Sequence, residues 1–105
     1  PAYAFKHICE KSSTSLNDFD TLEINEAFAS QTLACLRELG LPDNEPRLNC
    51  DGGAIGMGHP VGASGARLIV HMAHRIQQGL SSLALAGLCV SGGMGIASVI
   101  SKEPT

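Results

Sequence analysis

One run of the chain constrains its fold more than any other. Residues 83–90 read Leu-Ala-Leu-Ala-Gly-Leu-Cys-Val and contain no charged side chain. An almost continuous apolar run of this length is typical of a central β-strand that is buried on both faces. Because such a strand needs other elements above and below it, the sequence predicts a layered α/β fold.

The other elements are expected from hydrophobic periodicity and from turn residues. The expected helices span residues 2–11, 64–78 and the stretch from Asn25 to the stop signal at Gly40. The expected strands are 21–24, 47–51, 83–90 and a final strand over 96–100, antiparallel to the one before it. We therefore predict a single α/β domain over residues 1–105 with a mixed sheet.

The helix over 64–78 is expected to be the most deeply placed one. Its predicted inner face consists of five apolar residues, namely Ala66, Ile69, Val70, Ala73 and Ile76. Leu68 and Met72 add apolar surface beside that face. An apolar surface this wide predicts a helix that is buried around most of its circumference.

Composition excludes several classes of protein. The chain has 105 residues, of which 44% are hydrophobic and 16% charged, so a folded core is expected rather than disorder. The net charge of −3 argues against a nucleic-acid partner, because no basic excess is present to neutralise phosphates. No apolar run approaches the length of a membrane span, and no signal peptide is recognisable, so we expect no membrane partner.

Charge is distributed unevenly along the chain. Nine of the ten acidic residues lie within residues 1–51, whereas residues 52–102 contain no carboxylate side chain. A segment with so few charges is usually buried in a core, in an interface or beneath a larger assembly.

The four cysteines, Cys9, Cys35, Cys50 and Cys89, form no Cys-x-x-Cys pair and no zinc-ligand spacing. We therefore expect no metal site and no disulfide scaffold. The first three are interpreted as buried thiols of a reducing compartment such as the cytoplasm.

Three polar residues stand where a strand or a glycine loop gives way to another element: Asn25, His59 and Cys89. In α/β sheets ligands bind outside the carboxyl ends of strands, and Asn25 and Cys89 both follow strands. Each residue also has a structural interpretation. Asn25 can be the N-cap of the following helix, His59 an ordinary loop histidine and Cys89 a buried thiol.

The functional interpretation of the same residues is acid/base chemistry. A neutral imidazole can donate a hydrogen bond to an oxyanion, and a thiol that titrates near ~8.5 can exchange a proton. Ser91 is not a nucleophile of the Gly-x-Ser-x-Gly type, and segment 52–58 is not a phosphate loop. His71 and His74 are expected on the polar side of a helix rather than at a metal.

Three segments taken together resemble the C-terminal signatures of the thiolase family. They are Asn-Glu-Ala-Phe-Ala at 25–29, the glycine-rich stretch from Gly52 to Arg67 around Gly-His-Pro, and Cys-Val-Ser-Gly-Gly-Met-Gly at 89–95. Their order and spacing also match the family, and the resemblance covers nearly all of residues 1–102. It implies an acyl-CoA C-acyltransferase that makes or cleaves the carbon–carbon bond of a 3-ketoacyl-CoA through an acyl-cysteine.

The resemblance also implies a role for each matching residue. Asn25, acting through a water, and His59 would form an oxyanion hole for the enolate of acetyl-CoA. Cys89 would move the proton of the acetyl methyl group. Ala27 and Phe28 would border the pantetheine and acyl part of the ligand. These roles need acyl-CoA or coenzyme A as substrate and no resident cofactor.

The backbone N–H of Ser91 would help to line a second oxyanion hole. Ser91 stands where many members of the family have glycine, and Asp51 where they often have asparagine.

The same resemblance implies that this chain corresponds to one part of a larger enzyme. The nucleophilic cysteine of the family belongs to an N-terminal half, which would have to act in cis or in trans, and the first strand of the C-terminal domain is missing. Family members are dimers or tetramers, so a homo-oligomer is expected.

The alternative is a catalytically incompetent remnant that binds coenzyme A or serves in assembly. A ketoacyl synthase is disfavoured, because those enzymes usually carry histidine or asparagine where this chain has Cys89.

Overall fold

The computed structural model describes residues 1–90 and 93–102. Its helices are α1 (Ala2–Ser12), α2 (Ala29–Glu38), the short α3 (Ala54–Met57) and α4 (Ser64–Gln77), with a 3-10 turn over Leu16–Asp18. Its strands are β1 (Thr21–Ile24), β2 (Leu83–Val90) and β3 (Met94–Ser101). The predicted α/β class is confirmed, as are the helices near 2–11 and 64–78.

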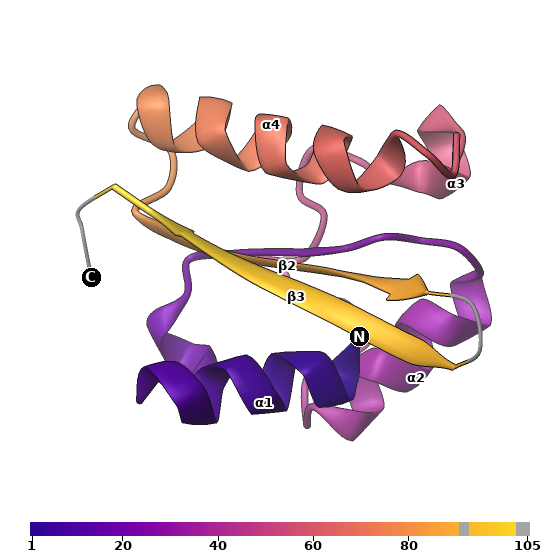
Figure 1. The fold of residues 1–105 in the computed structure, drawn as a ribbon, viewed down its shortest axis with the longest axis horizontal. Helices are drawn as coiled ribbons and strands as arrows, with labels where there is room; N and C mark the ends of the chain where they lie inside the picture. The colour runs from indigo at the N-terminus through magenta and orange to yellow at the C-terminus, as the bar shows by residue number, and fades with distance from the viewer. Residues whose placement is uncertain (91–92, 103–105) are drawn as a thin grey trace.

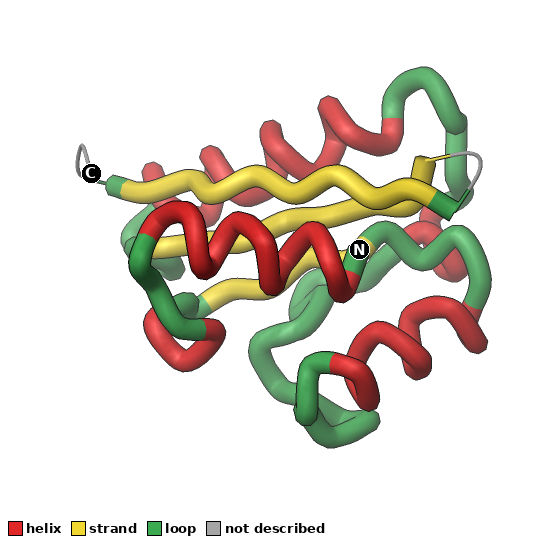
Figure 2. The backbone as a smooth tube through the Cα atoms, turned by 60° about the horizontal axis from the view of Figure 1, so that its bottom comes forward, coloured by secondary structure: helices red, strands yellow, loops and turns green. Residues whose placement is uncertain are grey.

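The three strands form one mixed sheet in the order β1-β2-β3, as Figure 2 shows. β1 runs parallel to β2, and β2 runs antiparallel to β3. The apolar run that opened the sequence analysis is therefore the central strand of this sheet. The antiparallel arrangement of the last two strands is confirmed.

Helices cover both faces of the sheet, which produces three layers (Figure 1). α4 lies on one face, and α1 and α2 lie on the other. Because side chains alternate along a strand, each strand of this sheet serves two different helical layers.

The first strand sorts its side chains by polarity between these two layers. Leu22 and Ile24 join the apolar cluster on the α1 and α2 face. Glu23 pairs in register with Ala86, which belongs to the smaller cluster packed against α4. The polar side of β1 is therefore directed at α4.

The apolar layer under α1 requires close approach between helix and sheet. Phe5 is fully buried there, and a Cβ atom added at Gly87 of β2 would stand 2.5 Å from its ring. A side chain at position 87 would thus displace Phe5. The glycine in the middle of the central strand is explained by this contact.

The prediction for the buried face of α4 was wrong. Residues Ser64, Leu68 and Met72 are buried against the sheet, where Ala84 and Ala86 leave room for them. Ile69 and Val70 of the predicted inner face are instead 38% and 56% exposed. The helix has two apolar stripes, and within this chain the sheet is wide enough to cover only one of them.

The predicted strand over 47–51 does not form. One isolated bridge joins Leu48 to Leu22, and Asn49 adopts a left-handed backbone with φ of 47°. A left-handed residue ends an extended segment, and Pro46 has no N–H to donate to a ladder. The segment still runs along β1, because Leu22 donates to the carbonyl of Arg47 and accepts from Asn49 N–H.

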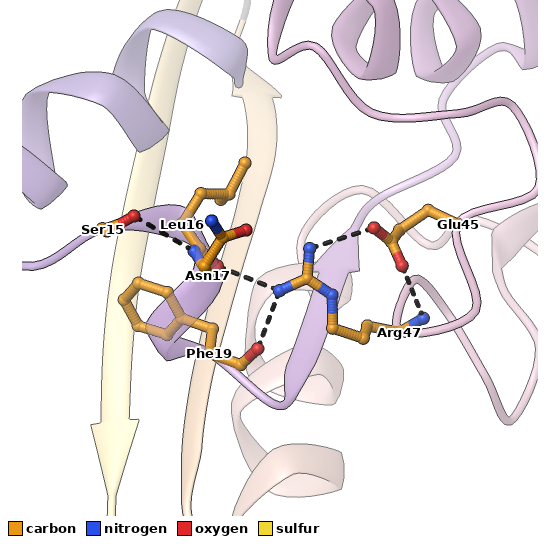
Figure 3. Close-up of polar contacts among 6 residues, drawn as sticks. All are labelled: Ser15, Leu16, Asn17, Phe19, Glu45 and Arg47. Carbon is orange, nitrogen blue, oxygen red and sulfur yellow. Dashed lines mark hydrogen bonds and ion pairs between the residues drawn. The ribbon is translucent and has the colours of Figure 1, made fainter.

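Arg47 fastens this segment to the turn before β1 (Figure 3). Its Nη1 donates to the carbonyl oxygens of Leu16 at 3.0 Å and Phe19 at 2.8 Å. Its Nη2 pairs with Glu45 Oε1 at 2.9 Å. A guanidinium with several donors in a fixed fork can satisfy such convergent acceptors, so one side chain replaces the missing strand contacts.

Candidate active site

The candidate site begins at Asn25, the residue that follows β1. Asn25 is 1% exposed, and its backbone N–H donates to the carbonyl of Gly87 at 2.9 Å. The N-cap interpretation of Asn25 was wrong, because α2 begins at Ala29 with Phe28 at the cap position. The Asn25 side chain is therefore free of a capping role, and its Oδ1 is buried without a hydrogen-bond partner.

The structure brings Asn25 and His59 together across 34 residues of sequence. Asn25 Nδ2 lies 3.4 Å from both ring nitrogens of His59. His59 Nδ1 also lies 2.5 Å from the hydroxyl of Ser64, the first residue of α4. The imidazole is thus held between the end of β1 and the start of α4.

Glu26 anchors the loop that carries His59. Its Oε1 accepts from the backbone N–H of Ile55 at 3.1 Å, and its Oε2 accepts from Asn49 Nδ2 at 2.9 Å. A Cβ atom at Gly53 would collide with this carboxylate, so the glycine lets the loop approach it. Two hydrogen bonds from one carboxylate fix the loop relative to the end of β1.

Asn49 completes this anchor from the side of the strand. Its Oδ1 accepts from the N–H of Ile24 at 3.0 Å, and its Nδ2 donates to the carbonyl of Ile24 at 2.9 Å. The amide therefore pairs with the last residue of β1 as a neighbouring strand would. Asn tolerates the left-handed backbone that this position requires.

Cys89 lies near the same end of the sheet but on the other face of β2. It pairs with Gly95 of β3, where an added Cβ would meet Pro1 N at 2.9 Å and Ala4 Cβ at 3.6 Å. Cross-strand partners share a face, so Cys89 is directed to the side of α1. Within residues 1–90 and 93–102, no hydrogen bond joins Cys89 to Asn25 or His59.

The residues expected to border a ligand have different surroundings. Ala27 is half-buried, and its N–H donates to the carbonyl of Asn25 at 3.0 Å. Phe28 is 71% exposed at the start of α2. Ser91 lies outside the described residues.

A buried acid adds charge to the α4 side of the sheet. Glu23 is fully buried, and neither carboxylate oxygen has a hydrogen-bond partner. Burial raises the pKa of the Glu23 carboxyl to about 7, against the opposing effect of the Arg67 charge.

Farther along α4, Arg75 donates to Asp51 Oδ2 at 2.6 Å and holds the pKa of that carboxyl below its ordinary value. His71 Nε2 lies 3.0 Å from the same oxygen. Asp51 is thus part of a charged cluster on one side of α4.

Sequence reasoning missed Ser64, Glu23 and the anchoring roles of Glu26 and Asn49. A charged residue in the middle of a short apolar strand was the available signal for Glu23. Ser64 gave no comparable signal, because a serine at the start of a helix is common.

The four cysteines are free thiols. In the described ranges, no three side chains of His, Cys, Asp or Glu are grouped as metal ligands would be. None of the helices in those ranges combines the length and the apolar character that a membrane span requires.

The arrangement has the parts of an acid/base site. A buried amide and an imidazole can present hydrogen-bond donors to a developing oxyanion, and a thiol at the neighbouring strand end can carry a proton. The fold and this site define an α/β domain with polar chemistry at the carboxyl end of two parallel strands.

Comparison with known proteins identifies the family. The family model described as thiolase, C-terminal domain, matches residues 1–102, and this chain belongs to that family.

Its relatives are longer proteins. A beta-ketoadipyl-CoA thiolase of Acinetobacter baylyi is 45% identical over 102 residues, which are 97% of this chain and 25% of that protein. The crystal structure of the Bacillus anthracis acetyl-CoA acetyltransferase is 44% identical with a TM-score of 0.89, covering 96% of this chain and 25% of its own.

Human mitochondrial 3-ketoacyl-CoA thiolase in complex with CoA is 39% identical with a TM-score of 0.90. It matches 99% of this chain over 26% of its own length. The chain therefore spans about a quarter of the length of the relatives it matches.

Proposed function

We propose that this chain is the C-terminal part of an acyl-CoA C-acyltransferase of the thiolase family, acting on 3-ketoacyl-CoA. The observation that supports this most directly is the contact of a buried Asn25 amide with the His59 ring. In this proposal the two side chains, with a water bound by Asn25, stabilise the enolate oxygen of an acetyl-CoA thioester. Donors aimed at a developing oxyanion each contribute about 2.7–4 kcal/mol to such a transition state.

Cys89 is the proposed proton carrier. In synthesis its thiolate takes a proton from the acetyl methyl group, and the electron pair moves onto the thioester oxygen as the enolate forms. The enolate carbon then attacks the carbonyl of an acyl-cysteine, and that cysteine leaves as a thiolate. Cleavage is the reverse sequence, in which Cys89 returns the proton to the enolate.

A substrate that lies across the carboxyl ends of β1 and β2 would contact both groups. It would meet Asn25 and His59 from the α4 side and Cys89 from the α1 side. Ala27 and the exposed Phe28 would border its pantetheine arm, and Ser91 N–H would line the hole for the acyl-cysteine. The proposed substrate is a coenzyme A thioester, and the proposed reaction uses no resident cofactor.

The remaining part of the active site is proposed to come from the N-terminal half of a thiolase, in cis or in trans. The nucleophilic cysteine would be part of that half. The second apolar stripe of α4, with Ile69 and Val70 exposed in this chain, supports a further protein layer over this helix.

A chimera tests this proposal. Residues 1–102 would replace the matching segment of the Bacillus anthracis acetyl-CoA acetyltransferase. We expect Cys89→Ala to lower carbon–carbon bond formation by about 100-fold or more while acylation of the nucleophile persists. His59→Ala is expected to lower it by about 100- to 1,000-fold.

Cys50→Ala is the matched control, because Cys50 is an exposed free thiol outside the site. Loss of neither step in the Cys89→Ala chimera would refute the assignment of Cys89.

The second candidate is a catalytically incompetent module that binds coenzyme A or serves in assembly. A folded chimera that lacks activity at both steps would support it. Alkylation of Cys89 in the 105-residue chain, with and without coenzyme A, separates a binding module from an inert remnant. Cys50 is the internal reference for reagent access.

A further inference from the structure

Glu23 is a charged residue in the middle of β1 that the proposed chemistry does not use. Its side chain is fully buried on the face of the sheet that is directed at α4. Within the part of the chain that the structure describes, neither of its carboxylate oxygens has a hydrogen-bond partner. Because an isolated charge in the interior is strongly unfavourable, a buried carboxylate needs a charge of opposite sign close by.

Arg67 is the cation that best meets this need. Its backbone N–H donates to the carbonyl of Ala63 at 2.9 Å, so it belongs to the first turn of α4. Its Nε is buried, and no described residue is hydrogen-bonded to that atom. The pKa of the Glu23 carboxyl is raised by burial, and the Arg67 charge is the strongest influence that lowers it. Such an attraction is stronger in a buried site than in water.

The other charged groups that act on Glu23 have partners of their own. Arg75 donates to Asp51 Oδ2 at 2.6 Å, and His71 Nε2 lies 3.0 Å from the same oxygen. Glu26 accepts two hydrogen bonds on the side of the loop. Among the described residues, these contacts leave the Arg67 guanidinium as the cation that is free to compensate the Glu23 charge.

The Glu23 and Arg67 pair lies one step away from the candidate site. Glu23 precedes Asn25 by one repeat of a strand, and Arg67 follows Ser64 by about one helical turn. Asn25 and Ser64 both contact His59. Glu23 and Arg67 therefore form the next level along the same boundary between β1 and α4.

We propose that Glu23 is a positioning residue that acts through the Arg67 charge to hold the first turn of α4 against β1. Ser64 lies in that turn and contacts His59, so the pair contributes to the orientation of the candidate site. The importance of this inference for catalysis rests on the proposed function. The attraction between the two side chains needs no substrate.

Carbon NMR of the 105-residue chain, labelled with ¹³C at the glutamate carboxyl groups, tests the attraction. Glu23→Gln identifies the Glu23 signal. In Arg67→Gln we expect the pKa of Glu23 to rise by about one pH unit or more, because the cation that opposes the effect of burial is gone. Arg67→Lys keeps the charge and should keep most of its effect. An unchanged Glu23 pKa in Arg67→Gln would overturn the proposal.

Arg37→Gln is the matched control for the titration. It removes an exposed arginine of α2 that is paired with Asp43, so the Glu23 pKa should not change. A rise as large as that in Arg67→Gln would show that total charge, rather than the Arg67 position, is responsible.

A second NMR measurement tests the positioning role near pH ~8, above the pKa of Glu23. Nuclear Overhauser contacts between the Asn25 side-chain amide and the His59 ring report how closely β1 and the loop before α4 approach. We expect these contacts to weaken in Glu23→Gln and in Arg67→Gln, and to persist in Arg67→Lys. Contacts of wild-type strength in both neutral variants would contradict the positioning role.

Kinetics of the chimera distinguish this inference from the proposed function. When the chimera with the wild-type segment is active, Glu23→Gln and Arg67→Gln should each lower kcat about 10-fold and leave KM for acetyl-CoA almost unchanged. The double variant should be no slower than either single one, because both changes remove the same interaction. Losses that multiply in the double variant would contradict a shared role. An inactive wild-type chimera would count against the proposed function, and the NMR contacts would still decide the inference.

Discussion

The two faces of the three-stranded sheet differ in the kinds of side chain that they bury. The α1 and α2 face is an apolar layer in which Phe5, Phe19, Leu22 and Leu85 are almost completely buried. The α4 face contains a smaller apolar cluster beside the buried polar residues Thr21, Glu23, Asn25 and Ser64. Unpaired polar groups lower stability when they are buried. The comparison indicates that one face mainly stabilises the fold, whereas the other holds most of the buried polar residues, Asn25 of the candidate site among them.

The largest expected effect is a loss of stability from a substitution on the apolar face. Phe5→Ala removes a fully buried ring from the cluster under β2. We expect a loss of about 3–5 kcal/mol in the free energy of unfolding, from lost burial and the cavity left behind. Urea denaturation followed by circular dichroism measures it.

Tyr3→Ala in the same helix is the control for that variant, because Tyr3 is 74% exposed. An equal loss in both variants would mean that the helix, rather than the buried face, accounts for the stability.

The next effect concerns the polar face and is pH-dependent. The pKa of Glu23 is raised by burial from its ordinary 4.5 to about 7, so the native state holds a proton that the unfolded state has released. Stability from this group is fully present below about pH 4.5 and falls as pH rises towards 7, by about 3 kcal/mol at most.

Glu23→Gln should remove this decline, because an amide does not titrate. The measurement is the difference in unfolding free energy between wild type and variant from pH 4.5 to 7.5, in which the contributions that the two proteins share cancel. Glu10→Gln, an exposed substitution on α1, should leave the decline in place. A decline that is unchanged in Glu23→Gln would show that another group titrates.

The smallest expected effect concerns Asn49, which connects the end of β1 to the Glu26 anchor of the loop that carries His59. Asn49→Gly keeps a residue that accepts a positive φ but removes three hydrogen bonds to Ile24 and Glu26. We expect a loss of about 1–3 kcal/mol, because buried strand and carboxylate groups lose a partner.

Hydrogen exchange of the Ile24 amide should rise together with this loss. Asn44→Gly, in an exposed loop, is the control and should change neither quantity. Unaltered protection of Ile24 in Asn49→Gly would argue against a strand-like role for this amide.

Much of the fold followed from the sequence because periodicity and burial agreed. The run 83–90 had to be a covered strand, and it is the central one. The run around Leu48 failed as a strand, because one left-handed residue and a proline outweighed its apolar pattern. The inner face of α4 was assigned to the wrong stripe, because a pattern with two apolar stripes does not indicate which one the sheet covers.

The candidate site was predictable to a smaller extent. Asn25, His59 and Cys89 were all singled out, and the approach of Asn25 to His59 is visible in the structure. Their catalytic roles stay predictions. The contact of Ser64 with His59 could not be foreseen, because it depends on how the chain turns at Pro60. Cys89 lies on the opposite face of the sheet from Asn25 and His59. This placement depends on strand register, which local sequence does not specify.

The contact between Glu26 and Gly53 has a consequence for how this sequence can vary over time. Both oxygens of Glu26 are held by Asn49 and Ile55, so the carboxylate could make way for a new methyl group at position 53 only by giving up these hydrogen bonds. A replacement of Gly53 would therefore either push the Glu26 carboxylate off its partners or require a shorter residue 26, and both changes would release the loop that carries His59. The two positions are therefore expected to be inherited as a pair.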